Sequence, residues 1–243
     1  MKSFGGVRAV AGVSLGVAAG EMLAVIGPNG AGKSTCFNML NGQIKPDAGR
    51  VVLAGRDITG LPPRKVWRLG VGRTFQITAT FASMTVRENV QTALLSHRRK
   101  LWQFGKPGRL YCIAEAQALL EQVEMGGQAD RPAGVLAYGD LKRLELAMAL
   151  SNAPKLLLMD EPTAGMAREE RAGLMQLARR LASAQGIAVL FTEHDMDVVF
   201  HAADRILVLD HGEVIAEGDG KTIRADARVR AVYLGSGRAT GGY

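Results

Sequence analysis

Residues 27–35 read Gly-Pro-Asn-Gly-Ala-Gly-Lys-Ser-Thr, a glycine-rich stretch that ends in a lysine and two hydroxyl residues. The apolar run before it, residues 22–26, favours a buried strand, and residues 33–40 favour a helix. Glycines let the backbone curl until several N–H groups point into one hollow, and the helix N-terminus adds partial positive charge. The stretch therefore predicts a phosphate-binding strand–loop–helix unit within an α/β fold.

The side chains of this loop predict its ligand. Lys33 can reach the β- and γ-phosphates of a nucleotide, and the Ser34 hydroxyl can complete the coordination of a Mg²⁺ ion on those phosphates. A glycine-rich turn that matches by chance is the alternative, which the flanking strand and helix disfavour. The expected ligand is thus ATP or another nucleoside triphosphate with Mg²⁺. The candidate binding residues are Gly27, Pro28, Asn29, Gly30, Ala31, Gly32, Lys33, Ser34 and Thr35.

The amino-acid composition is that of a folded protein, but it does not identify a binding partner. Of the 243 residues, 47% are hydrophobic and 22% are charged, so one large domain or two lobes can bury a core. No stretch approaches the roughly 18 apolar residues of a membrane span, so we expect a cytoplasmic polypeptide. The net charge of +7 suits nucleotides, anionic lipid surfaces or nucleic acid.

Two further residues, one before the loop in the sequence and one after it, are candidates. Phe4 is the only aromatic residue among the first 20 residues, and it could stack on an adenine base or simply pack against the fold. After a turn at 45–49, residues 50–55 favour a strand. Residues 70–76 favour another strand, which ends on the polar residue Gln76.

Residues 77–153 have a different character, because helical apolar spacing replaces strand-like runs. Residues 84–96 and 113–123 predict helices in this insertion or lobe. Between them, residues 97–109 combine basic, aromatic and loop-forming residues. This basic loop could bind nucleic acid or lipid headgroups, or it could be a solvated surface loop.

Residues 155–162 read Lys-Leu-Leu-Leu-Met-Asp-Glu-Pro, an apolar run that delivers two adjacent carboxylates to a strand end. An apolar run of this kind predicts a central parallel strand, whose carboxyl end lines the same crevice as the phosphate loop. We therefore expect Asp160 to hold Mg²⁺ and Glu161 to polarise the water that attacks phosphorus. Without the loop, this pair would indicate only the start of a helix.

The remaining segments continue the α/β pattern. Residues 168–185 predict a packing helix that ends at Gly186, and residues 187–192 predict a buried strand followed by His194. The last strands, around His211, predict a hairpin. Residues 219–243 favour a basic helix with a glycine-rich tail.

Taken together, these motifs resemble the ATP-binding subunits of ABC transporters over essentially the whole chain. The loop at 27–35 resembles the family's Walker A loop, and residues 156–161 resemble its Walker B strand. Gln76 and His194 lie where the family has its Q-loop glutamine and switch histidine. The resemblance implies that Glu161, His194 and Gln76 are catalytic and that Ser34, Gln76 and Asp160 hold the metal.

The family signature, typically Leu-Ser-Gly-Gly-Gln, is similar to residues 136–140. Gly139 matches it, whereas Ala137 replaces the serine and has no hydroxyl for the contact to the γ-phosphate that the family makes. The resemblance adds Ala137, Tyr138, Gly139 and Asp140 to the nucleotide-binding residues. Ala167 also departs from the pattern, because it stands where an asparagine or aspartate is usual.

The resemblance implies an α/β fold with a P-loop NTPase (ABC ATPase) core: a parallel sheet, an antiparallel β subdomain and a helical lobe. Residues 1–76 and 154–218 would form the core and β subdomain, 77–153 the helical signature lobe, and 219–243 a C-terminal helix and tail. The start looks short, because family members usually have another strand before the residue matching Phe4.

Several blocks are similar to the subgroup that serves branched-chain amino acid importers, including residues 73–76, 84–90 and 164–166. The resemblance implies an ATPase that dimerises with itself or with a second ATP-binding subunit around two ATP molecules. Transmembrane permease subunits would bind it at the cytoplasmic face of the inner membrane, and a periplasmic or extracellular substrate-binding protein would act indirectly. The expected substrates are branched-chain or other hydrophobic amino acids.

Two other functional hypotheses remain open, because proteins of both kinds carry the same core motifs. One is an exporter-type ATPase, for instance in lipopolysaccharide transport. The other is a soluble ABC protein acting on ribosomes or DNA, which only the +7 charge and the basic loop support. Such proteins usually carry two ATP-binding modules or long coiled coils, and this chain has one module without sustained heptads, so we expect no nucleic-acid partner.

Overall fold

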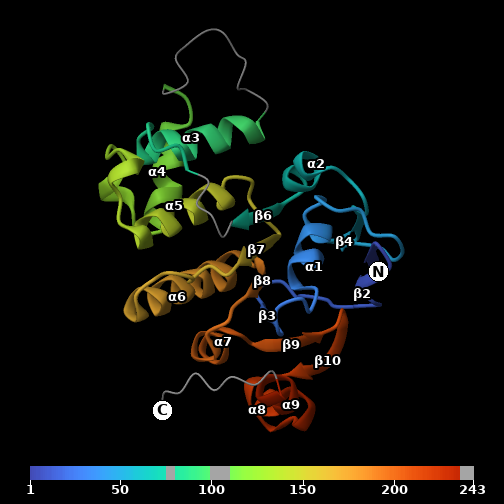
Figure 1. Ribbon diagram of the computed structural model, residues 1–243. Helices are drawn as coiled ribbons and strands as arrows, with labels where there is room; N and C mark the ends of the chain where they lie inside the picture. Colours follow the sequence, from blue (N-terminus) through green and yellow to red (C-terminus); the bar gives the residue numbers. More distant parts are fainter. Residues whose placement is uncertain (75–79, 99–109, 236–243) are drawn as a thin grey trace.

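The computed structural model describes residues 1–74, 80–98 and 110–235, with a central six-stranded sheet in the order β10-β9-β3-β8-β7-β6 (Figure 1). The strands of this sheet are β3 (Met22–Ile26), β6 (Val71–Thr74), β7 (Leu156–Asp160), β8 (Ala188–Thr192), β9 (Arg205–Asp210) and β10 (Glu213–Gly218). Every pairing is parallel except that of β10 with β9. The predicted α/β fold with a parallel sheet is confirmed.

The other elements surround this sheet. Two short hairpins pair β1 (Lys2–Phe4) with β2 (Val7–Val10) and β4 (Val52–Leu53) with β5 (Arg56–Asp57). The helices are α1 (Lys33–Leu40), α2 (Pro63–Arg68), α3 (Val86–His97), α4 (Ile113–Gln122), α5 (Tyr138–Leu150), α6 (Arg168–Gln185), α7 (Met196–Ala202), α8 (Gly220–Ala225) and α9 (Ala227–Gly235). Figure 1 shows α3, α4 and α5 gathered in one lobe beside the sheet.

Strand register brings the predicted site residues to one edge of the sheet. The carboxyl ends of parallel strands line the ligand crevice in folds of this type. Thr192, the last residue of β8, is in register with Val25 of β3 and with Asp160 of β7. The carboxyl end of β3, which leads into the glycine-rich loop, and the acidic carboxyl end of β7 therefore lie at the same edge of the sheet, with β8 between them.

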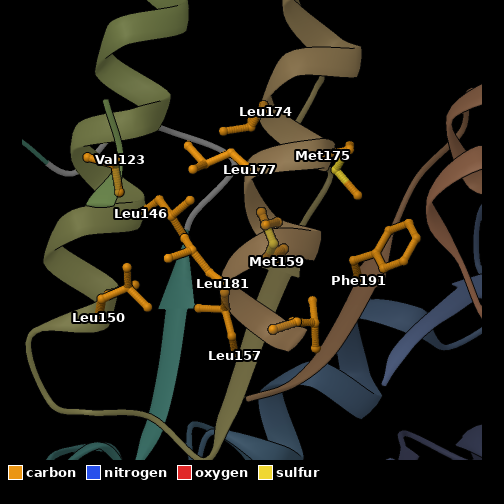
Figure 2. Close-up of a cluster of buried hydrophobic side chains, with 14 of the residues drawn as sticks. Val123, Leu146, Leu150, Leu157, Met159, Leu174, Met175, Leu177, Leu181 and Phe191 are labelled. Atoms are coloured by element: carbon orange, nitrogen blue, oxygen red, sulfur yellow. The ribbon is translucent and has the colours of Figure 1, made fainter. Parts of the chain in front are cut away.

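The sheet is buried on both faces because alternate residues of each central strand pack on opposite sides. One face, which includes Leu157 and Phe191, packs against α5 and α6 (Figure 2). The other face, which includes Leu158 and Leu190, packs against Phe37 of α1. This explains why the strands are continuous apolar runs rather than alternating ones.

Leu177 of α6 tests how much this core stabilises the fold, since its side chain is 1% exposed. We expect Leu177→Ala to lower the free energy of unfolding by about 2–5 kcal/mol, because the change leaves a cavity. Gln176→Ala, one exposed position earlier on the same helix, should change it by no more than about 0.5 kcal/mol. Urea denaturation measures both, and equal losses in the two variants would contradict this packing.

Several sequence predictions differ from the structure in detail. The strand predicted over 50–55 covers only Val52–Leu53 (β4), because Ala54 and Gly55 have φ of 46° and 79° and turn the chain into β5. The single helix predicted from residue 219 is instead two helices, α8 and α9, because the Asp226 carboxylate accepts bonds from the Arg228 and Val229 N–H groups and starts the second one. Within the described residues, no helix is long and apolar enough to cross a membrane.

Candidate nucleotide site

The loop between β3 and α1 has a backbone that only glycine can adopt at two positions. Gly27 and Gly32 have φ of 151° and 101°. A Cβ on Gly27 would lie 2.1 Å from the Leu209 carbonyl oxygen, and one on Gly32 would lie 2.3 Å from that of Ala9. The loop is therefore pressed against β9 and against the chain of β2.

The start of α1 provides donors suited to an anion. The first backbone N–H of this helix to donate to a backbone carbonyl is that of Cys36, which bonds to the Gly32 carbonyl oxygen at 2.9 Å. No side chain caps the N-terminus of the helix. The N–H groups of Lys33, Ser34 and Thr35 thus have no backbone acceptor in the described part of the chain. Phosphate oxygens match this set of donors.

Lys33 lies over the same loop. Its Nζ donates to the carbonyl oxygens of Gly27 at 2.6 Å and Pro28 at 3.1 Å. Burial lowers the pKa of the Lys33 ammonium, and the negative charges of Glu161 and Asp160 oppose that effect. These two carboxylates therefore lie near enough to act on the loop lysine, as the sequence predicts.

Asp160 is held through both carboxylate oxygens. The Thr192 hydroxyl donates to Oδ1 at 2.9 Å, and Nη2 of Arg73 donates to Oδ2 at 3.1 Å. No group of three acidic, histidine or cysteine residues that could hold a metal occurs among the described residues. The hydroxyl of Ser34 and the carboxylate of Asp160 are hard oxygen donors that suit Mg²⁺, which usually takes its other ligands from phosphates and water.

Glu161 and His194 meet directly. Nε2 of His194 lies 3.0 Å from Oε1 of Glu161. Glu161 has a left-handed φ of 48°, and its N–H donates to the Thr192 hydroxyl at 3.0 Å. A left-handed backbone is rare for a residue with a side chain and is held here by its surroundings. The structure thus brings together the proposed water-polarising carboxylate and the predicted switch histidine.

The residues beside His194 fix this geometry, and sequence reasoning did not single them out. Glu193 is 5% exposed and accepts hydrogen bonds from the Thr163 N–H at 2.9 Å and the Thr163 hydroxyl at 2.7 Å. Asp195 accepts from Arg171 at 2.7 Å and begins α7. Thr192, Glu193 and Asp195 therefore tie the chain around His194 to the segment that follows Asp160.

Glu193 makes stability depend on pH. Burial raises the pKa of its carboxyl, whereas the bonds from Thr163 oppose that rise. Its contribution to stability is present below its unfolded pKa and is lost as pH rises through the higher folded value. We expect Glu193→Gln to become more stable relative to wild type as pH increases from about 4.5 to 8. Urea denaturation across this range measures the difference, and a constant one would contradict the prediction.

The described residues do not test the roles predicted for two other candidates, Phe4 and Gln76. Phe4 lies in β1, is 48% exposed and has the Lys2 ammonium 5.4 Å from its ring centroid. Gln76 lies outside the described residues, as does most of the basic loop, residues 99–109. The roles predicted for Phe4 and Gln76 stay predictions.

The signature-like residues lie at the start of α5 in the helical lobe, and Gly139 faces the start of α6. Ala137 precedes α5, whose N-terminus has no side-chain cap. A Cβ on Gly139 would lie 3.0 Å from Oε1 of Glu170, and one on Gly165 would lie 3.5 Å from the Tyr138 ring. The Asp140 carboxylate accepts from Gln128 at 3.1 Å. Within one chain, the start of α5 therefore contacts the lobe, the start of α6 and the segment just before α6.

Known proteins share these features. A family model described as ABC transporter matches residues 10–164, and one described as branched-chain amino acid ATP-binding cassette transporter matches residues 213–239. The chain is 39% identical to the high-affinity branched-chain amino acid transport ATP-binding protein BraF of Pseudomonas aeruginosa over 96% of this chain and 94% of that protein.

Solved structures agree with the fold. The chain is similar to an ATP-binding cassette of an ABC transporter in its ADP conformation, at 35% identity and a TM-score of 0.85, over 96% of this chain and 95% of that one. It is also similar to a dimeric ATP-binding cassette in a post-hydrolysis state bound to ADP and Pi. That match has 27% identity and a TM-score of 0.74 over 90% of this chain and 94% of the other.

A glycine loop between a buried strand and a helix, next to an acidic strand end, defines a nucleotide-binding α/β protein. The extent of the similarity narrows this class: the chain belongs to the ATP-binding proteins of ABC transporters and is an ATPase of that family. The family predicted from the motifs is confirmed.

Proposed function

We propose that this chain hydrolyses ATP to drive an importer of branched-chain or other hydrophobic amino acids. The observation that carries the proposal is the similarity to BraF along 96% of the chain, together with the branched-chain family match at residues 213–239. The amino acid itself is selected elsewhere, in the permease and the substrate-binding protein, so this chain would supply energy and not specificity.

The geometry suits hydrolysis by positioning and electrostatics. The N–H groups at the start of α1 and the Lys33 ammonium would hold the phosphates of ATP, while Ser34, Asp160 and Gln76 would hold Mg²⁺. A bound Mg²⁺ neutralises charge on the phosphate oxygens. Glu161 would orient and polarise the attacking water, and His194 would fix the Glu161 carboxylate through the 3.0 Å contact.

A complete site needs two subunits in this proposal. The start of α5, with Gly139, would face the γ-phosphate held by a partner subunit. Ala137 has no hydroxyl to offer there, so the uncapped N–H groups of the helix would carry the contact. Ala167 likewise supplies no side-chain hydrogen bond across the dimer. The partner is a second copy or a different ATP-binding subunit.

The permease would bind at a groove between the sheet and the helical lobe. This groove has a volume of about 390 Å³ and lies between α2 and β6 on one side and α3 and α5 on the other. Trp67, Val71 and Met148 line it with apolar surface. A short helix of a permease subunit would fit there, and the chain would sit peripherally on the cytoplasmic face of the inner membrane.

Purification from native membranes tests this function. The tagged chain, extracted in mild detergent, should bring down multi-span permease subunits and an ATP-binding partner that mass spectrometry can identify. A chain with Trp67→Ala should lose the permease but keep nucleotide binding. Recovery with ribosomes or DNA, and no membrane subunits, would overturn the proposal.

A further inference from the structure

Arg73 links three elements around the candidate metal site. It lies on β6 with a side chain that is 11% exposed. Its Nη1 donates to Oδ1 of Asn38 in α1 at 2.8 Å and to Oε1 of Gln43 at 3.1 Å. Its Nη2 donates to Oδ2 of Asp160 at 3.1 Å. One planar group therefore ties the helix after the phosphate loop to the acidic end of β7.

This contact gives Asp160 a counter-ion before any metal arrives. A guanidinium stays charged at all ordinary pH values and fits a carboxylate through its fixed fork of donors. Since the Thr192 hydroxyl donates to Oδ1, both oxygens of Asp160 already accept hydrogen bonds. A divalent cation that binds Oδ2 must approach the positively charged guanidinium of Arg73, which already bonds to this oxygen.

We propose that Arg73 is a positioning residue that acts through Asp160. It holds the carboxylate in place when the site lacks a divalent cation, and it competes with the cation for Oδ2. The inference rests on the proposed function, which gives Asp160 its metal role. The positive charge of Arg73 should therefore weaken metal binding, while the hydrogen bond from its guanidinium keeps the Asp160 carboxylate oriented.

The position of Arg73 also connects this site to the groove between the lobes. Arg73 lines that groove together with Trp67 and Arg64. One side chain thus spans the distance between the proposed permease surface and the metal carboxylate.

Metal affinity can be measured without turnover. Mn²⁺ replaces Mg²⁺ as the probe, and electron paramagnetic resonance counts bound Mn²⁺ with the full chain in excess over ADP. We expect Arg73→Gln to bind Mn²⁺ about tenfold more tightly than wild type, because one nearby positive charge is gone. Arg73→Lys, which keeps the charge, should stay within about twofold of wild type.

Arg64→Gln is the matched control, since Arg64 lines the same groove without an Asp160 contact. It should change Mn²⁺ affinity by less than about twofold. Unchanged or weaker Mn²⁺ binding by Arg73→Gln would overturn the inference. Failure of the wild-type chain to bind fluorescent ADP would instead overturn the proposed function, so the two failures are distinct.

A structure of the wild-type chain with ADP and Mn²⁺ provides a second test, which holds even if Arg73→Gln does not fold. The inference predicts that Nη2 of Arg73 and Oδ2 of Asp160 separate beyond about 3.5 Å. A bound ion next to an intact Arg73–Asp160 bond would contradict competition.

Discussion

Glu161→Gln should lower ATP turnover about 10²- to 10⁴-fold while ATP binding stays near the wild-type level, because the amide cannot accept a proton from the attacking water. The change keeps the size of the side chain and its ability to bond to His194, which lies 3.0 Å from Oε1. ATP should therefore hold the subunits together without being cleaved. Phosphate release and size-exclusion chromatography in ATP measure the two effects.

Glu169→Gln is the control for this variant, since Glu169 is exposed at the start of α6. It should hydrolyse ATP like wild type and should not accumulate as a dimer. Full turnover by Glu161→Gln would show that another group activates the water, and the assignment of Glu161 would have to be withdrawn.

Lys33→Ala should weaken ATP binding about 10- to 100-fold. The lysine is the charged donor over the phosphate loop, and a hydrogen bond from a charged group contributes about 1.5–3 kcal/mol. Its substitution also removes the bonds to the Gly27 and Pro28 carbonyl oxygens, so thermal unfolding should accompany the measurement. Titration with a fluorescent ATP analogue gives the affinity.

Lys221→Ala serves as the control, because Lys221 is an exposed lysine of α8. Each variant removes one positive charge from the chain, and the two differ only in the position of the lysine that is removed. Equal affinities for the analogue would mean that the loop lysine does not contact phosphate, which would contradict the site described above.

The sequence predicted the central sheet because burial on both faces leaves continuous apolar runs, as in β3, β7 and β8. It predicted a tight loop at 27–35 from its glycines, and in the structure Gly27 and Gly32 indeed leave no room for a side chain. It missed α2, although Pro63 at its first position is a common helix start. The hairpin turn at Ala54 was missed because alanine rarely adopts a left-handed φ.

The contacts that complete the site could not be predicted from pattern alone. Arg73 and Asp160 are 87 positions apart, and Thr163 and Glu193 are 30 apart. Neither pair has a spacing that local periodicity can detect, since their proximity follows from the strand order β3-β8-β7-β6. Thr192 carried a usable signal, as a polar residue that ends an apolar strand, the same signal that marks Gln76.

In the proposed function, two ATP-binding subunits build each hydrolysis site, one with the loop at 27–35 and Glu161, the other with the start of α5. The most direct test is the ATPase rate per chain as a function of protein concentration, for the purified chain alone and mixed with its co-purified ATP-binding partner. We predict that the rate per chain rises with concentration until the dimer is complete. A measurable rate that stays constant on dilution would contradict a shared site.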